Sequence, residues 1–257
     1  MKNENASQKN RRKRGIYILP NLLTTANLFC GFYSLLESVK GEFNLAAAAI
    51  IIAVVLDSFD GRIARMTNTM TKFGAEFDSL ADLVTFGVAP AVLAYIWALQ
   101  AYGKWGWIAS FLFVTCGALR LARFNIQTGI IKIKVFNGLP IPASASILAT
   151  GVVLYFYLGG TGKVHHISVL IAMVVLALLM VSNVKYYSFK DLNFFSRKPF
   201  MSFVLIVVIM IIVYAEQQIT LFTFALGYTL SGPVWWLIRY WKKAVNDKTE
   251  ESVKVNI

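Results

Sequence analysis

Long apolar runs with almost no charge recur along the whole chain, and they constrain its fold more than any other feature. Residues 45–56 and 83–99 are two of them. The chain is 57% hydrophobic and 15% charged, whereas soluble domains are about 45–50% apolar and about 25% charged. Lipid offers the backbone no hydrogen bonds, so runs of this length cross membranes as helices. We therefore predict an all-α polytopic membrane protein with a single transmembrane bundle.

Eight transmembrane helices account for the apolar runs. The polar segments 1–15 and 242–257 fall outside them, and we expect both to be disordered: a basic cytoplasmic tail and a charged cytoplasmic tail around a transmembrane domain of residues 16–241. An even number of spans places both tails on one side. The predicted spans are 16–36, 43–66, 73–99, 107–124, 138–158, 167–184, 200–214 and 219–241.

Basic residues divide unequally between the two sides of this topology. Lys40, Lys104 and Lys163 fall on one side, and the other 22 of the 25 lysines and arginines fall on the side of the termini. Cytoplasmic loops carry such an excess. We therefore expect a multi-pass protein of the cell membrane with both termini in the cytoplasm. This topology explains the net charge of +12, so the charge does not indicate a nucleic-acid partner.

Carboxylates gather at one place between two apolar runs. Five of the thirteen acidic residues lie between positions 57 and 82. Ionised carboxylates beside a membrane span are costly, and a bound divalent cation compensates several of them at once. Two pairs lie three or four residues apart, so each pair occupies one face of a helix. The five residues are Asp57, Asp60, Glu76, Asp78 and Asp82.

The short polar loop between these two pairs makes their helices antiparallel. Asp57, Asp60, Asp78 and Asp82 then lie at similar depths, roughly 8–14 Å from the cytoplasmic helix ends, and can converge on one point. Because no histidine or cysteine lies among them, the predicted ligand set is made of oxygen atoms. Such a set suits Mg²⁺, Mn²⁺ or Ca²⁺.

Arginines near the acidic residues indicate what this site could bind. Mg²⁺ commonly binds through a few carboxylates together with substrate phosphates, and Arg62 and Arg65 lie one turn away. This favours phosphoryl chemistry on a lipid. Two alternatives stay open: a cation-transport site, and a buried ion-pair network between the aspartates and Arg62, Arg65, Arg120 and Arg123.

Polar residues also form a stripe in the first predicted span. Asn21, Thr24 and Asn27 recur at near-helical spacing. They could form hydrogen bonds between helices or line a polar ligand site.

The acidic stretch has the pattern D-x2-D-G-x2-A-R-x8-G-x3-D-x3-D. This pattern resembles the signature of the CDP-alcohol phosphotransferase family, and eight fixed positions make the match specific. The chain is also similar to the serine-using bacterial and archaeal branch of that family over about its first three-quarters. The similar stretches are residues 20–24, 78–87, 118–125, 138–143 and 183–190.

The resemblance implies an enzyme that transfers a phosphatidyl group from CDP-diacylglycerol to L-serine and releases CMP. It also implies a homodimer and two divalent ions, Mg²⁺ or Mn²⁺. Glycerol phosphate or inositol phosphate would be the acceptor in other branches. A cation transporter is the alternative from a different class.

The same resemblance assigns roles to individual residues. Asp57 and Asp78 would bridge both metal ions, Asp60 would complete one site and Asp82 the other. Asp82 would also be the catalytic base. The residues expected to bind the CDP-lipid are Asn21, Thr24, Gly61, Arg65, Thr71 and Gly74.

An acceptor with a carboxylate needs a cation in the site. Arg120 and Arg123, at the cytoplasmic end of the fourth predicted span, are candidates for binding serine, and Lys185 is a third. Alternatively, the arginines anchor a helix end as the positive-inside bias requires.

Overall fold

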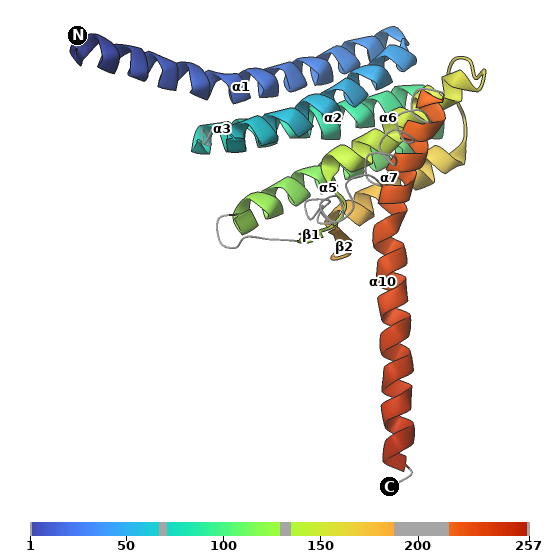
Figure 1. The fold of residues 1–257 in the computed structure, drawn as a ribbon. Helices are drawn as coiled ribbons and strands as arrows, with labels where there is room; N and C mark the ends of the chain where they lie inside the picture. Colours follow the sequence, from blue (N-terminus) through green and yellow to red (C-terminus); the bar gives the residue numbers. More distant parts are fainter. Residues whose placement is uncertain (1, 67–70, 129–134, 188–215, 256–257) are drawn as a thin grey trace.

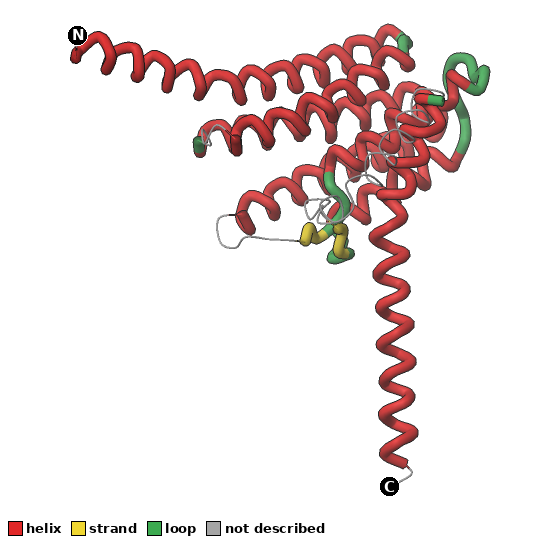
Figure 2. The backbone as a smooth tube through the Cα atoms, in the orientation of Figure 1, coloured by secondary structure: helices red, strands yellow, loops and turns green. Residues whose placement is uncertain are grey.

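A computed structural model describes the backbone of residues 2–66, 71–128, 135–187 and 216–255. Side chains are described for residues 21–59, 71–126, 138–186, 216–239 and 241. The described chain is helical, apart from one small two-stranded sheet (Figure 2). The expected span at residues 200–214 lies outside the described residues.

The first two helices, α1 (Lys2–Lys40) and α2 (Phe43–Met66), pack along each other. Gly41 makes the turn between them with a φ of +87°, a conformation that glycine adopts without a steric penalty. The basic segment before residue 16, expected to be disordered, instead continues the first helix from Lys2. Extending an existing helix adds one hydrogen bond per residue and needs no new nucleus.

A third rod runs from Lys72 to Tyr102 and changes its helical type along its length. Its successive parts are α3 (Lys72–Asp82), η1 (Leu83–Val88), α4 (Ala89–Ala94), η2 (Tyr95–Leu99) and η3 (Gln100–Tyr102). Segments η1 and η2 are π-helical. Pro90 follows η1 closely and has no N–H to donate. The periodicity of the sequence did not predict these π segments, which often occur at functional sites.

Three further helices follow: α5 (Lys104–Thr128), α6 (Ile141–Tyr157) and α7 (Ile167–Val181). Between α5 and α6, and again after α7, the chain forms strands β1 (Val135–Asn137) and β2 (Lys185–Tyr187), which pair antiparallel. We expected loops at both places. Gly138 ends β1 with a φ of +83°, and a Cβ there would lie 2.2 Å from the carbonyl oxygen of Met180. Only glycine therefore fits at this position.

The last described helix, α10 (Gln217–Val255), packs against α6 and β2. The Tyr186 hydroxyl donates to the Thr229 carbonyl oxygen at 3.1 Å, and Gly232 lies against the Tyr186 ring. The C-terminal part of α10 projects away from the bundle (Figure 1). The segment 242–257, expected to be disordered, is helical as far as Val255. Its lysines, glutamates and alanine are compatible with a helix.

The exposed surface of the bundle is apolar. On α7, Ile167, Ile171 and Leu178 are exposed at helical spacing, while Met173 and Ala177 on the other face are buried. Three described helices are long and apolar enough to cross a membrane: Lys72–Tyr102, Lys104–Ile126 and Gln217–Arg239. Three shorter apolar helices accompany them. Apolar side chains fill the core of the bundle and also cover its outer surface, which suits contact with lipid. The protein is therefore an integral membrane protein.

Candidate metal and substrate site

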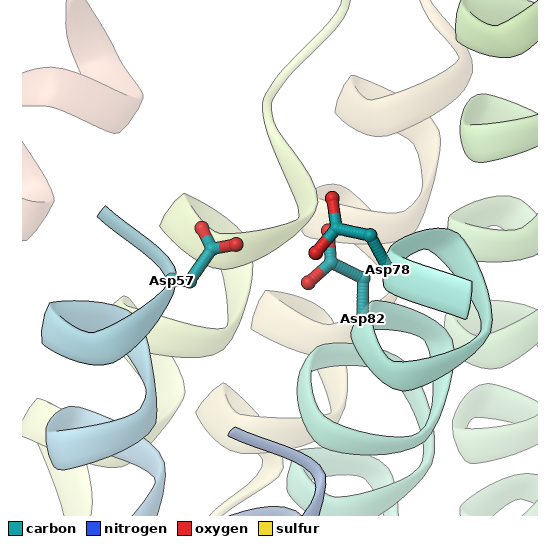
Figure 3. Close-up of side chains that lie close together, drawn as sticks. All are labelled: Asp57, Asp78 and Asp82. Carbon is teal, nitrogen blue, oxygen red and sulfur yellow. The ribbon is translucent and has the colours of Figure 1, made fainter. Parts of the chain in front are cut away.

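Three aspartates from two facing helices point toward one another (Figure 3). Asp57 belongs to α2, and Asp78 and Asp82 belong to α3. One carboxylate oxygen from each lies within 4.8 Å of the other two, and all three side chains are half-buried. The antiparallel packing thus brings together residues that lie up to 25 positions apart in the sequence.

The surroundings of these carboxylates fit a bound cation. Asp78 Oδ1 is buried and has no hydrogen-bond partner, and the carboxylates of Asp57 and Asp82 come within hydrogen-bonding reach of each other. The positive charge of Arg120 lies within electrostatic range of Asp57 and Asp82. Several carboxylate oxygens gathered at one place form the kind of ligand set that a hard divalent cation prefers. The alternative expectation, an ion-pair network, also involves Arg62 and Arg65, whose side chains lie outside the described residues.

Four further residues of the acidic signature lie on the last turns of α2: Asp60, Gly61, Ala64 and Arg65. Their side chains, and that of the neighbouring Arg62, lie outside the described residues.

The polar stripe of α1 lies beside α3. Thr24 and Asn27 are 4% and 0% exposed. A Cβ on Gly74 would lie 3.2 Å from Asn21 Oδ1 and 3.1 Å from Thr71 Oγ1. Glycine at position 74 therefore lets three of the expected CDP-lipid residues lie close together. Thr71 also caps α3, because its hydroxyl oxygen accepts from the Gly74 N–H at 2.9 Å.

The two arginines of α5 have different surroundings. The Arg123 guanidinium donates to Asn183 Oδ1 at 2.7 Å and to the Val181 carbonyl oxygen at 3.4 Å. Arg120 is half-buried and forms no hydrogen bond or ion pair with another described side chain. It instead lies within electrostatic range of Asp82 and Asp57. Of the two, Arg120 is therefore the one that lies near the aspartates.

The third expected serine-binding residue, Lys185, is exposed and lies on β2 opposite Asn137. No described contact joins it to the aspartates. Tyr228 of α10 is instead the residue from the C-terminal region that lies within electrostatic range of Arg120. No pattern in the sequence singled out Tyr228.

Two further contacts tie the aspartate-bearing helix to its neighbours, and the sequence did not predict either pairing. Asn27 Nδ2 donates to Asp82 Oδ1 at 3.4 Å. Ser79 and Asn125 exchange hydrogen bonds at 3.0 and 3.3 Å, which joins α3 to α5. The signal in the sequence was the polar residue itself, since uncharged polar residues within spans commonly bond to another helix. The partner, 46 or 55 residues away, was not predictable.

Comparison with known proteins gives a consistent result. The sequence profile of CDP-alcohol phosphatidyltransferases matches residues 17–181, more than half of the chain. The CDP-diacylglycerol–serine O-phosphatidyltransferase of Helicobacter pylori is 38% identical over 226 residues, which cover 86% of this chain and 92% of the relative. The enzyme of the same name from Bacillus subtilis is 37% identical over 172 residues, covering 67% and 91% of the two chains.

An archaeal relative extends the similarity. The archaetidylserine synthase of Methanothermobacter thermautotrophicus is 39% identical over 170 residues, which cover 65% of this chain and 69% of the relative. The profile match includes α2 and α3, and thus all four aspartates of the signature. The chain belongs to the CDP-alcohol phosphatidyltransferase family.

Proposed function

We propose that this protein is a phosphatidylserine synthase: it transfers the phosphatidyl group of CDP-diacylglycerol to L-serine and releases CMP. The convergence of Asp57, Asp78 and Asp82 within 4.8 Å is the observation that carries this proposal. Relatives of this name support the choice of serine, since the one from Helicobacter pylori covers 86% of the chain.

Asp57, Asp60, Asp78 and Asp82 hold two divalent ions, Mg²⁺ or Mn²⁺, in this proposal. Ions held by these residues would supply positive charge to neutralise the diphosphate of the donor and the phosphate of CMP. The unpaired Asp78 Oδ1 and the absence of nitrogen or sulfur ligands among the three converging residues support oxygen-preferring ions.

The donor's nucleotide lies along the polar face between α1, α2 and α3. Asn21, Thr71 and Gly74 lie together there, and Thr24, Gly61 and Arg65 complete the set that the family signature indicates. Glycine at positions 61 and 74 leaves room for the nucleotide, and Arg65 suits its phosphates.

Asp82 acts as the general base. It takes the proton from the serine hydroxyl, and the serine oxygen then attacks the phosphorus atom that carries diacylglycerol. The bond between this phosphorus and the bridging oxygen breaks, and CMP leaves with that oxygen. Asp82 Oδ1 accepts a hydrogen bond from Asn27 at 3.4 Å, which ties this carboxylate to α1.

Serine's carboxylate pairs with Arg120. Arg120 lies within electrostatic range of Asp82 and Asp57, so a serine held by its carboxylate would present its hydroxyl close to the base. Arg123 and Lys185 contribute to the positive potential at this end of the bundle.

The proposal includes a topology of eight spans, with both termini and the active site on the cytoplasmic side, and a homodimeric assembly. The lopsided distribution of lysine and arginine supports the orientation. Impermeant labelling of single cysteines introduced at Lys40 and at Lys185 in intact cells tests it. Labelling at Lys40 alone is expected.

The experiment for the reaction is a competition between acceptors. Purified protein is given CDP-diacylglycerol and Mn²⁺ or Mg²⁺, with labelled serine, glycerol 3-phosphate or inositol phosphate. Serine-dependent release of CMP, abolished by EDTA, is expected. Turnover with another alcohol alone would assign a different branch of the family, and cation flux in liposomes without nucleotide turnover would indicate a transporter.

A further inference from the structure

Asn27 lies within α1 and is completely buried, yet only one of the two polar atoms of its side chain forms a hydrogen bond. It is 0% exposed. Its Nδ2 donates to Asp82 Oδ1 at 3.4 Å, while its Oδ1 is buried without a hydrogen-bond partner. A buried amide oxygen without a partner is unfavourable. The stability of the helix pair therefore does not explain why asparagine, rather than an apolar residue, stands here.

The backbone of Asn27 is held against the rod that carries Asp82. Thr85 Oγ1 donates to the Asn27 carbonyl oxygen at 3.2 Å. One turn along α1, a Cβ on Gly31 would lie 2.5 Å from Thr85 Oγ1 and 2.7 Å from Thr85 Cα. Glycine at position 31 thus permits a backbone approach that a larger residue would prevent.

This contact falls where the rod changes its helical type. Asp82 is the last residue of α3, and Thr85 lies in the π-helical segment η1 that follows directly. A π-helical turn changes the direction of the side chains around it. Asn27 therefore touches Asp82 through its side chain and η1 through its backbone, so it fixes the aspartate relative to the turn that orients it.

We propose that Asn27 is a positioning residue that holds the Asp82 carboxylate in the orientation needed to accept the proton of the acceptor hydroxyl. This proposal depends on the role of Asp82 in the proposed function. One oxygen of Asp82 accepts the amide N–H, which restricts rotation of the carboxylate, and an oxygen of Asp82 lies within 4.8 Å of one from Asp57 and one from Asp78. A neutral donor restrains the base without adding a positive charge beside the bound cations.

The test compares Asn27→Ala with Ser34→Ala in the full-length protein. Ser34 is a matched control because it lies on the same helix, is 0% exposed and also has a buried oxygen without a partner. For Asn27→Ala we expect kcat with serine to fall about 10–100-fold, the effect typical of lost support for a site residue. The KM for CDP-diacylglycerol should stay within about twofold of the wild-type value, because the donor binds before the base accepts a proton. Ser34→Ala should have the same kcat with serine and the same KM for CDP-diacylglycerol as the wild type.

A second variant and a measurement without turnover distinguish positioning from a structural role. Thr85→Val keeps the shape of the side chain and removes the donor to Asn27, so a smaller fall in kcat is expected. Stabilisation of each variant by CDP-diacylglycerol, measured as a shift of the melting temperature in detergent, should equal that of the wild type. Equal kcat for Asn27→Ala and Ser34→Ala would overturn the proposal. The proposal would also be overturned if Asn27→Ala lost the melting-temperature shift caused by CDP-diacylglycerol to the same extent as it lost kcat. If the wild type itself releases no CMP with serine, the proposed function fails instead, and this result is recognisable before any variant is compared.

Discussion

Arg120 and Arg123 lie three residues apart at the end of one helix, but each belongs to a different region of the molecule. Arg123 faces the C-terminal end of α7, where it donates to Asn183 and to the Val181 carbonyl oxygen. Arg120 faces the acidic site and lies within electrostatic range of Asp82 and Asp57. Arg123 therefore uses its charge in contacts with the chain at the end of α7, whereas the charge of Arg120 lies near the aspartates. Residues of the same type, three positions apart, can thus have different surroundings.

The largest effect is expected at the acidic site. Asp82→Asn should reduce serine-dependent CMP release about 10²–10⁴-fold, because the amide cannot accept a proton from the acceptor. Steady-state assays of CMP release measure this. Glu76→Gln is the matched control: Glu76 lies on α3, is exposed and is not among the converging carboxylates. Similar losses in both variants would mean that the charge of the helix, not the position of Asp82, matters.

Arg120→Ala should produce the next largest effect. We expect the KM for serine to rise about tenfold or more while the KM for CDP-diacylglycerol stays within about twofold, because only the acceptor has a carboxylate for this cation. Separate titrations of the two substrates measure the two constants. An unchanged KM for serine would remove Arg120 from the acceptor site.

Arg123→Ala should instead lower the stability of the protein and leave the KM for serine nearly unchanged. Losing two hydrogen bonds from a charged donor should destabilise the protein by about 1–3 kcal/mol, while the KM for serine changes by no more than about twofold. Thermal unfolding in detergent, together with the serine titration, gives both numbers. If Arg123→Ala weakens serine binding as much as Arg120→Ala does, the comparison between the two arginines is wrong.

Tyr186→Phe should have the smallest effect, about 1 kcal/mol of stability. Burial raises the pKa of Tyr186 to about 12, so its hydroxyl keeps its proton and donates to Thr229 throughout the neutral range. Since the raised pKa opposes ionisation in the folded state, the corresponding stability is lost only above about pH 10, where an unfolded tyrosine ionises. Melting temperatures of wild type and variant should therefore differ by the same amount at pH 6 and pH 9. A difference that changes between these pH values would contradict this view.

Local patterns in the sequence were sufficient to predict the helical class and the approach of Asp57, Asp78 and Asp82, whereas the side chain of Asp60 lies outside the described residues. The carboxylates lie within 26 residues, and helical spacing together with a short connection determines that Asp57, Asp78 and Asp82 meet. The division between Arg120 and Arg123 was not predictable, because it depends on Asn183, which lies 60 residues from Arg123. The same holds for the contact of Asn27 with Asp82, and for the π-helical turns, which depend on how α1 packs against the third rod.

Binding of Mn²⁺ tests the central claim most directly, since the claim is that carboxylates of α2 and α3 jointly hold divalent cations. Purified wild type, Asp78→Asn and Glu76→Gln are titrated with Mn²⁺ in the presence of CDP-diacylglycerol without serine, and free Mn²⁺ is measured by electron paramagnetic resonance. We predict specific binding to the wild type and Glu76→Gln, and weakening by at least about tenfold in Asp78→Asn. Equal binding of Mn²⁺ by all three proteins would contradict the account.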